Sequence, residues 1–321
     1  MQGMKAVIGK NTERAKEILE SGGLVAIPTE TVYGLAANAF DAVAAAKIFE
    51  AKNRPSFDPL IVHTSSVDRL ESFTKDIPDE LRLLAERFWP GPLTLLLEKN
   101  SKIPDLVNSG LDRVAVRIPN HPLALRLLDS LDFPLAAPSA NPFGYVSPTT
   151  AEHVYNQLGE KIPYILDGGH SNVGIESTII GYENGKPTVY RLGGTAVEEI
   201  ERVIGNVVVK PHSSSNPQAP GMLKSHYSPM KDVVLGDIES LLKEYNPEEV
   251  AVLSWKEVYR QVPETRQFVL SAKGDLAEAA SRLFQGLRYL DSQDVKLILT
   301  ELLPETGLGR AINDRLRRSA V

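Results

Sequence analysis

Hydrophobic and polar positions along the first 210 residues follow two alternating periods. Segments 11–23 and 43–52 carry apolar residues at helical spacing, and the short apolar run 24–27 (LVAI) is typical of a buried strand. The remaining predicted strands are 59–63, 93–98, 114–118, 134–137, 176–182, 187–193 and 206–210, and the remaining predicted helices are 78–88, 121–131 and 197–205. Helices that alternate with buried strands predict an α/β domain with a mixed sheet.

Residues 211–230 interrupt this pattern with four prolines, several serines and few apolar residues. Such a composition is typical of an interdomain linker. Strand and helix patterns resume over 231–321, including a long helix around 275–290, and predict a small doubly wound α/β domain. We therefore expect a larger domain over 1–210, a linker over 211–230 and a smaller domain over 231–321.

The composition narrows the class of protein. Of the 321 residues, 42% are hydrophobic and 24% charged, which excludes a disordered or fibrous chain. The net charge of −6 weighs against a protein that spreads over nucleic acid, because such binding depends on neutralising phosphates. Without cysteine, the chain has no thiolate nucleophile and no cysteine-ligated zinc. No apolar run approaches a membrane span or a signal peptide, so we expect a cytoplasmic protein without membrane contact.

The chain contains neither of the common glycine-rich nucleotide loops, so side chains would have to hold any phosphate. The segment PTETVYG, 28–34, directly follows a predicted strand and brings the Thr29 and Thr31 hydroxyls to its carboxyl end. Open α/β sheets bind ligands at that end. The same residues also fit an ordinary turn, with threonine caps and a positive φ at Gly34. The pattern leaves both interpretations open.

A basic pair occurs in AKNRPSFDPLIVH, 51–63. Lys52 and Arg54 would face opposite ways in an extended segment, but the two prolines that follow allow them to converge. A lysine beside an arginine fork commonly holds a polyphosphate or a carboxylate. His63 ends the next predicted strand. A solvated basic turn is the alternative interpretation.

A third polar segment, APSANPFGYVSPTT, lies between a strand and a helix whose expected cap is Thr149 or Thr150. Ser139, Asn141 and Ser147 can donate to phosphate oxygens near that helix N-terminus, where the dipole favours an anion. Ordinary turn chemistry would select the same residue types.

Arginines also occur in apolar strand contexts. Arg113 precedes VAVRI, Arg117 lies within it, Ser177 lies in GIESTII, and Arg191 ends VYR. A charged residue in such a strand is rarely buried without a partner, so these arginines are candidates for binding an anionic ligand.

Taken together, these blocks resemble the YrdC/Sua5 family. The resemblance rests on PTETVYGL, the K-x-R pair followed by P-x-x-D-P-L, PSAN at 138–141, and GIESTI. The linker PGMLKSHYSP and the terminal GLGRAINDRLRRSA are similar to the longer Sua5 form, so the resemblance covers nearly the whole chain. It implies a YrdC-like twisted mixed sheet with helices, followed by a smaller Rossmann-like α/β domain.

The resemblance also implies an activity, the synthesis of threonylcarbamoyl-AMP. The family condenses L-threonine, bicarbonate or CO₂, and ATP, and releases pyrophosphate. A separate transferase complex then modifies adenosine 37 of tRNAs that read ANN codons, so direct tRNA binding is not required. Mg²⁺ is expected with ATP, and no ligands for it are predicted.

The family's residue roles transfer to positions of this chain. The K-x-R…S-x-N signature corresponds to Lys52, Arg54, Ser139 and Asn141. Threonine would be held by Thr31, His63, Arg117, the Ala137 backbone and Ser177. ATP would lie across Lys52, Arg54, Asp58, Arg113, Ser139, Asn141, Ser147, Arg191 and Tyr227.

One position departs from the family pattern. The residue before Pro-Leu is commonly Asn, and here it is Asp58. A carboxylate there would repel phosphate unless it binds magnesium or a ribose hydroxyl.

The linker carries His226 and Tyr227, which are unusual in a passive tether. We hypothesise that it folds over the active-site cleft, with Tyr227 on the nucleotide, and shields the reactive anhydride from water. A surface linker with an incidental aromatic residue is the alternative.

Three other classes of function compete with synthesis of the adenylate. A double-stranded-RNA-binding module of YrdC-like fold is opposed by the acidic charge. A hydrogenase-maturation carbamoyltransferase would be larger and rich in zinc-binding cysteines. A structural scaffold would not need polar ligand-type blocks at so many strand ends.

Overall fold

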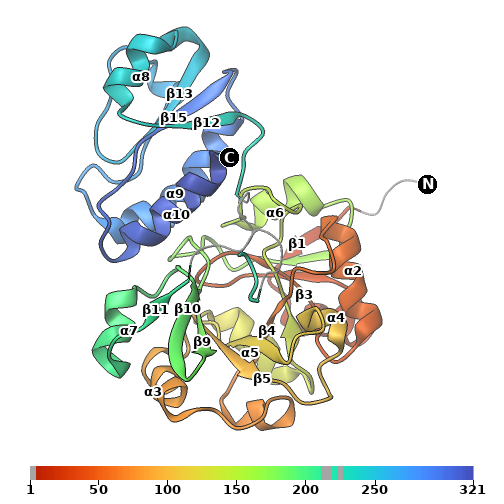
Figure 1. Ribbon diagram of the computed structural model, residues 1–321. Helices are drawn as coiled ribbons and strands as arrows, with labels where there is room; N and C mark the ends of the chain where they lie inside the picture. Colours follow the sequence, from red (N-terminus) through yellow and green to blue (C-terminus); the bar gives the residue numbers. More distant parts are fainter. Residues whose placement is uncertain (1–4, 211–217, 223–226, 321) are drawn as a thin grey trace.

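The computed structural model describes residues 5–210, 218–222 and 227–320, which form two α/β domains (Figure 1). The strands of the first domain are β1 (Val7–Gly9), β2 (Val25–Ile27), β3 (Gly34–Asn38), β4 (Ile61–His63), β5 (Leu93–Glu98), β6 (Arg113–Arg117), β7 (Leu135–Ala136), β8 (Tyr164–Leu166), β9 (Thr178–Glu183), β10 (Lys186–Arg191) and β11 (Val208–Val209). Its helices are α1 (Thr12–Glu20), α2 (Ala42–Lys52), α3 (Asp79–Phe88), α4 (Asp105–Asn108), α5 (Pro122–Ser130), α6 (Ala151–Leu158) and α7 (Val197–Ile204), with the 3-10 turn η1 (Asp68–Ser72).

These strands form one mixed sheet. Over the described residues it has eleven strands in the order β1-β8-β2-β3-β7-β4-β6-β5-β9-β10-β11. Pairs such as β4–β6 and β5–β9 are parallel, whereas β2–β3 and β5–β6 are antiparallel. The predicted mixed α/β architecture is therefore confirmed.

The two faces of the sheet are covered differently. Side chains alternate between the faces along each strand. Val62, Leu95 and Val116 face the main core, which also takes side chains from α2, α3, α6 and α7. On the opposite face, α1 and α5 pack over β2 and β8. Further along that face Ile61, Leu96, Ala115, Ile179 and Tyr190 contact the linker residues Ala219 and Met222. The linker thus takes the place of a helix over part of the sheet.

The second domain has a four-stranded sheet in the order β12-β15-β13-β14, and every described pair in it is parallel. Its strands are β12 (Asp232–Leu235), β13 (Val250–Ser254), β14 (Gln267–Val269) and β15 (Leu297–Thr300). Its helices are α8 (Ile238–Glu244), α9 (Leu276–Asp291) and α10 (Leu308–Ser319), with the 3-10 turns η2 (Pro247–Glu249) and η3 (Glu264–Arg266).

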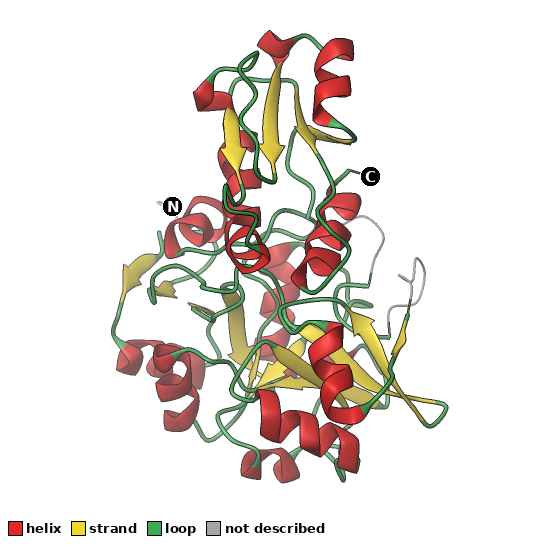
Figure 2. Cartoon of the chain, turned by 90° about the vertical axis from the view of Figure 1, so that its left-hand side faces the viewer, coloured by secondary structure: helices red, strands yellow, loops and turns green. Residues whose placement is uncertain are grey.

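Helices α9 and α10 lie on the side of the second domain that faces the first (Figures 1 and 2). Val32, Val146 and Ile175 of the first domain share one apolar cluster with Phe284 and Ile312 of these helices. Polar contacts add to this interface: Arg288 donates to the Ser147 carbonyl at 3.2 Å, and the Tyr145 hydroxyl lies 2.5 Å from the Asp291 carboxylate. The two domains are therefore in extensive contact.

Most predicted elements are present, and the differences have a simple cause. Residues 93–98 form β5 as predicted, and Thr150 caps α6 by accepting from the His153 amide. Strands β1, β3 and β8 were not predicted from the sequence, because they have only three to five residues each and little alternation of apolar and polar residues. Within the described residues, no helix is both long and apolar enough to cross a membrane. Residues 211–217 and 223–226 of the predicted linker lie outside the described residues.

Candidate active site

A pocket lies at one edge of the first sheet, on the face that bears Ile61 and Ala115. His63 and Arg117 are register partners at the carboxyl ends of the parallel strands β4 and β6. Ser177 precedes β9, which runs parallel to β5 and therefore antiparallel to β6, so its first residues meet the same edge. Polar side chains gather here as the strand-end argument predicts.

Arg117 is fixed in the pocket wall by three partners. One terminal nitrogen lies 2.6 Å from the Glu30 carboxylate, and the other donates to the Thr31 hydroxyl at 2.7 Å. Its Nε donates to the Gly91 carbonyl at 3.1 Å. Both charged groups are buried, which requires such pairing. The expectation that Arg117 has a partner is met by Glu30, an acid that the sequence reading did not select.

The PTETVYG segment is a turn and a pocket wall at once. The Thr29 hydroxyl accepts from the amides of Thr31 and Val32, both at 3.2 Å, as the turn interpretation predicts. The predicted positive φ at Gly34 is wrong, because Gly34 begins strand β3. A Cβ at Gly34 would lie 3.2 Å from the Ala137 Cβ, so glycine here permits close approach of the Ala137–Ser139 segment.

His63 is buried with its Nδ1 3.2 Å from the Ile61 carbonyl oxygen, which can only accept. Burial, followed by the neighbouring charge of Arg117, lowers the pKa of His63 to about 3. The imidazole is therefore neutral near pH 7 and a weak base. Its chemistry suits binding a ligand better than abstracting a proton from one.

Lys52 and Arg54 lie at the end of a helix and contact different groups. The segment is not extended, because Lys52 is the last residue of α2 and Asn53 ends the helix in a left-handed conformation with φ 54°. The Lys52 ammonium donates to the Ser139 carbonyl at 2.5 Å and to the Asn141 carbonyl. Burial, then the charge of Arg54, holds the pKa of Lys52 well below its usual value. Lys52 thus supports the PSAN segment from behind.

Asp58 is the partner of Arg54. The two side chains form a buried ion pair at 2.9 Å, and the guanidinium also donates to the Asp58 and Pro59 carbonyls. Asp58 does not reach the pocket formed by the described residues, whereas Arg54 lines it. Here the carboxylate positions an arginine instead of facing a phosphate.

Asn141 and Ser139 have different places in the PSAN segment. The Asn141 amide donates to the Pro142 and Tyr145 carbonyls, both at 2.8 Å, and so braces the loop. Ser139 pairs with Gly34 through an isolated bridge and lines the pocket.

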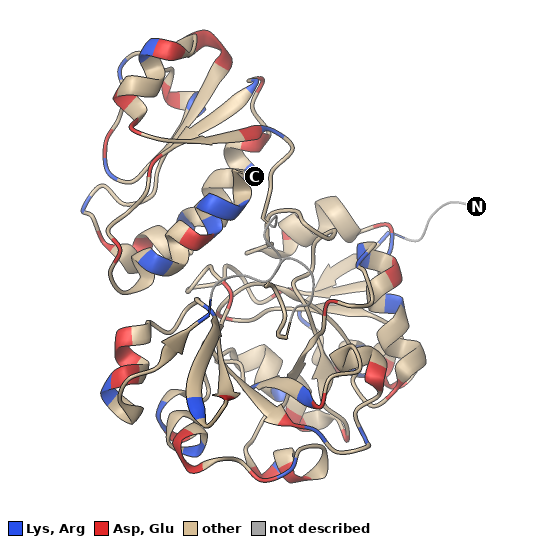
Figure 3. Cartoon of the chain, viewed as in Figure 1, with Lys and Arg blue, Asp and Glu red and all other residues tan. Residues whose placement is uncertain are grey.

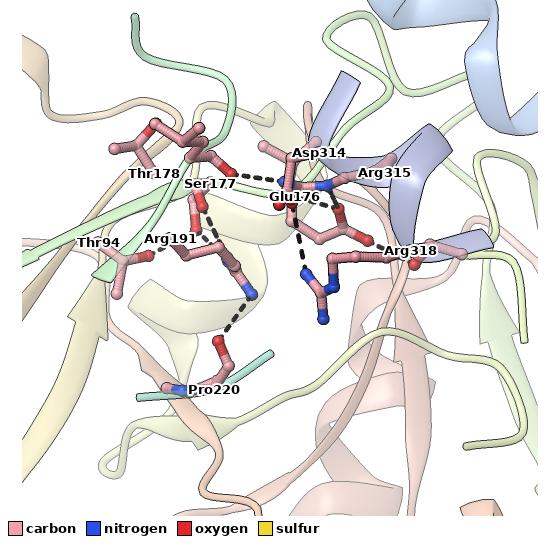
Figure 4. Close-up of polar contacts among 12 residues, drawn as sticks. Thr94, Glu176, Ser177, Thr178, Arg191, Pro220, Asp314, Arg315 and Arg318 are labelled. Atoms are coloured by element: carbon pink, nitrogen blue, oxygen red, sulfur yellow. Dashed lines mark hydrogen bonds and ion pairs between the residues drawn. The ribbon is translucent and has the colours of Figure 1, made fainter. Parts of the chain in front are cut away.

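Arg191 and Ser177 are joined at the far wall, as Figure 4 shows. Arg191 donates to the Ser177 carbonyl through Nε at 3.0 Å and a terminal nitrogen at 2.9 Å, and to the Ser177 hydroxyl at 3.0 Å. Thr94 bonds the same hydroxyl at 2.7 Å. A register shift between Val189 and Arg191 turns the arginine toward the pocket. Burial lowers the pKa of Arg191 to about 10, so it remains a cation at neutral pH.

The linker supplies part of the pocket. Arg191 donates to the Pro220 carbonyl at 3.4 Å. Gly221 has a φ of +74°, and a Cβ added there would lie 3.1 Å from a terminal nitrogen of Arg191, which is a tight contact. Tyr227 is buried, stacks on Phe284 at 5.5 Å between ring centroids, and lines the pocket. His226 lies outside the described residues.

The structure brings together nine of the predicted site residues as pocket lining: Thr31, Arg54, His63, Arg117, Ala137, Ser139, Ser177, Arg191 and Tyr227. Five others are not part of the lining that the described residues form: Lys52, Asp58, Arg113, Asn141 and Ser147. The ligand contacts of all fourteen stay predictions.

Two of these five have other partners in the structure. Arg113 is at the other end of β6, where it donates to the Tyr182 carbonyl at 2.8 Å and the Tyr190 hydroxyl at 2.9 Å. The Ser147 hydroxyl lies 2.5 Å from the Glu176 carboxylate, which itself lines the pocket. Glu176 and Glu30 were not predicted, because an anionic ligand points to cations in the sequence and not to the acids that hold those cations.

Comparison with known proteins places this chain in a family. The family model for Sua5, YciO and YrdC proteins, described as "Telomere recombination", matches residues 17–193, more than half of the sequence. The chain belongs to the Sua5/YciO/YrdC family. A second model, described as the C-terminal domain of threonylcarbamoyl-AMP synthase, matches residues 195–321, so this family member has the long Sua5 form.

Full-length relatives agree with this assignment. This chain is 42% identical over 322 residues to a Pyrococcus abyssi protein named threonylcarbamoyl-AMP synthase. The alignment covers 95% of this chain and 93% of the relative. A Bacillus subtilis protein of the same name is 41% identical, with 96% and 92% covered. The crystal structure of P. abyssi Sua5 complexed with L-threonine has a TM-score of 0.91 at 40% identity and covers 98% of this chain and 97% of its own. Escherichia coli YciO, at 22% identity and a TM-score of 0.52, shares the fold over 60% of the chain.

The neutral state of His63 predicts a pH-dependent stability. Its folded pKa of about 3 lies below the ordinary value of 6.5, so between these values the unfolded chain binds a proton that the folded chain does not. Stability is therefore full above pH 6.5 and is lost as the pH falls. From pH 6.5 to 5.0, we expect the wild type to lose about 1.5 kcal/mol more than His63→Gln in the free energy of unfolding. Urea unfolding of the full-length wild type and of His63→Gln at both pH values measures this difference in the free energy of unfolding. If both proteins lost the same free energy of unfolding, a neutral buried His63 would be contradicted.

Proposed function

We propose that this protein is a threonylcarbamoyl-AMP synthase, which converts L-threonine, bicarbonate or CO₂, and ATP to threonylcarbamoyl-AMP and pyrophosphate. The observation that carries the proposal is the full-length similarity to P. abyssi Sua5 with L-threonine, combined with a pocket that three arginines line here. Two anionic groups, a carboxylate and a triphosphate, must meet in such a site, and arginine forks suit both.

The threonine site would lie around Arg117. Its guanidinium is held by Glu30, Thr31 and Gly91, and the side chain lines the pocket. A guanidinium fixed in this way is preorganised for the amino-acid carboxylate. Neutral His63 and the Ser177 hydroxyl would complete the site without adding charge.

The triphosphate would lie between Arg54 and Arg191, with Ser139 on the PSAN segment. Both arginines are held by backbone carbonyls or a carboxylate, so they keep their places without a ligand. Lys52 and Asn141 would act through the segment they support. Positive charge at fixed positions stabilises the charge that develops on phosphorus as pyrophosphate leaves.

The reaction would need no covalent enzyme intermediate. The threonine nitrogen forms a bond to the carbon of CO₂ and loses a proton, giving a carbamate. A carbamate oxygen then attacks the α-phosphorus of ATP, the bond to the β-phosphate bridging oxygen breaks, and pyrophosphate leaves. The enzyme's share would be to position the reactants and exclude water.

Magnesium would enter with ATP. Among the described residues, no group of three or more His, Asp or Glu is placed to hold a metal ion. Mg²⁺ commonly binds through substrate phosphates with few protein ligands, which fits this site. We further propose that the adenylate passes to a separate transferase complex that modifies tRNA, in the cytoplasm, and that this chain need not hold tRNA itself.

The double-stranded-RNA-binding alternative is not favoured. The cleft arginines are buried and paired, and they are not spread along an open surface that a duplex could contact.

The proposed reaction predicts pyrophosphate release from ATP that depends on both threonine and bicarbonate. The full chain is assayed with each substrate omitted in turn, and the product is identified as threonylcarbamoyl-AMP by mass spectrometry. Pyrophosphate release that is absent, or independent of threonine, would overturn the proposal.

Substitution of Arg117 by lysine separates the two substrates. Lysine keeps the charge next to Glu30 but loses the fork, so the KM for threonine should rise about tenfold while the KM for ATP changes little. Steady-state kinetics with each substrate varied measures the two constants. Arg126→Lys, on the exposed side of α5, is the matched control and should behave as wild type. Equal changes in both KM values would contradict the assignment of Arg117 to threonine.

The linker would act as a lid, because Pro220, Gly221 and Tyr227 line the pocket together with Arg191. Tyr227→Ala should admit water to the anhydride, so that the ratio of pyrophosphate released to adenylate recovered rises about threefold or more. Tyr227→Phe keeps the ring on Phe284 and should change the ratio less. Tyr289→Ala, on the more exposed side of α9, is the control. An unchanged ratio in Tyr227→Ala would reject the lid.

A further inference from the structure

Helix α10 of the second domain places one arginine against Glu176, a residue that lines the pocket. Arg315 is fully buried, and its Nε and one terminal nitrogen each lie 3.1 Å from the same Glu176 oxygen. Its other terminal nitrogen donates to the Leu192 carbonyl and to Asp314, both at 2.7 Å (Figure 4). Figure 3 shows the basic residues of α10 close to the first domain. The guanidinium therefore joins the two domains at the pocket.

Glu176 connects this arginine to the proposed ATP site. Its carboxylate lines the pocket, and the oxygen that does not meet Arg315 accepts from the Ser147 hydroxyl at 2.5 Å. Ser147 is one of the predicted ATP contacts. The next residue, Ser177, holds Arg191 through its carbonyl and hydroxyl. One carboxylate thus lies between a predicted nucleotide contact and the arginine of the far wall.

An unpaired carboxylate at this place would oppose nucleotide binding. Repulsion between like charges is strong where water is excluded, and Glu176 is 7% exposed. The other two acids near the pocket, Glu30 and Asp58, are neutralised by arginines of their own domain. Glu176 takes its arginine from the second domain, where Arg315 also pairs with Asp314 and Arg318 supplies a second cation to Asp314.

We propose that Arg315 is a positioning residue of the ATP site. It neutralises Glu176 and fixes it, so that the pocket presents Arg54 and Arg191 to the triphosphate without a competing negative charge. The second domain then completes the site electrostatically as well as covering it. This inference rests on the proposed function, because it assigns the triphosphate to this wall.

A purely structural role makes a different prediction. If Arg315 only holds the domains together, its loss weakens the contact whether or not Glu176 is charged. If Arg315 acts by neutralising Glu176, removal of both charges restores nucleotide binding. The pair of substitutions Arg315→Met and Glu176→Gln separates the two roles, because Gln can still accept from Ser147.

The experiment compares wild type, Arg315→Met, Glu176→Gln and the double variant in the full chain. We expect Arg315→Met to raise the KM for ATP about tenfold, with the KM for threonine changed less, because it leaves a buried carboxylate unpaired. The double variant should return to within about threefold of Glu176→Gln. Arg315→Lys, which keeps the charge but not the fork, should lie between wild type and Arg315→Met. Arg317→Met, exposed on the same helix and paired with Glu305, is the matched control.

Two results would overturn the inference: an unchanged KM for ATP in Arg315→Met, or a double variant as defective as Arg315→Met. If Arg315→Met folds poorly, Arg315→Lys compared with Arg315→Lys/Glu176→Gln answers the same question. Calorimetric titration of each variant with a non-hydrolysable ATP analogue measures binding without turnover. If the wild type has no threonine-dependent activity, the proposed function is rejected. The role of Arg315 in nucleotide binding is then still decided by the calorimetric data.

Discussion

A guanidinium group cannot be buried alone, and the candidate site is arranged around that constraint. Arg54, Arg117 and Arg315 are each buried against a carboxylate, at 2.9, 2.6 and 3.1 Å respectively. A buried charge without a partner would cost several kcal/mol, and the paired acid also prevents the side chain from turning away. The acids therefore determine where the arginines point. The chain has a net charge of −6, yet three arginines line its pocket. Local pairing with acids, and not the net charge of the chain, determines where such arginines lie.

The alternation of side chains along the strands decides which face of the sheet becomes the pocket floor. Val62 and Val116 face the helices of the main core, whereas Ile61, His63 and Arg117 face the linker. A helix over this part of the face would fill the space that a ligand needs. The short turn at 218–222 covers the apolar positions with Ala219 and Met222 and still leaves the strand ends open beside it. The linker therefore covers part of the sheet and forms part of the pocket at the same time.

The sequence predicted the sheet's longer strands, the two-domain organisation and most of the pocket lining. The strand-end argument pointed to His63, because chain direction alone brings such ends together, whereas Arg117 and Ser177 were selected as polar residues in apolar strands. Other features depend on three-dimensional context. Arg113 has the same apolar strand pattern as Arg117, yet it lies at the opposite end of β6, and position within a strand sets its distance from the edge. Glu176 meets Arg315 across 139 positions of sequence, and no local pattern signals such a pair.

The apolar cluster under the linker has a consequence for the first domain taken by itself. Ile61, Leu96, Ala115, Ile179 and Tyr190 form a continuous patch that Ala219 and Met222 cover. A chain shortened before these two residues would expose that patch to water at the mouth of its own active site. Exposed apolar surface of this kind promotes self-association. Solubility of the larger domain is thus tied to a segment outside it, and the linker is as much a part of that domain's surface as of the connection between domains.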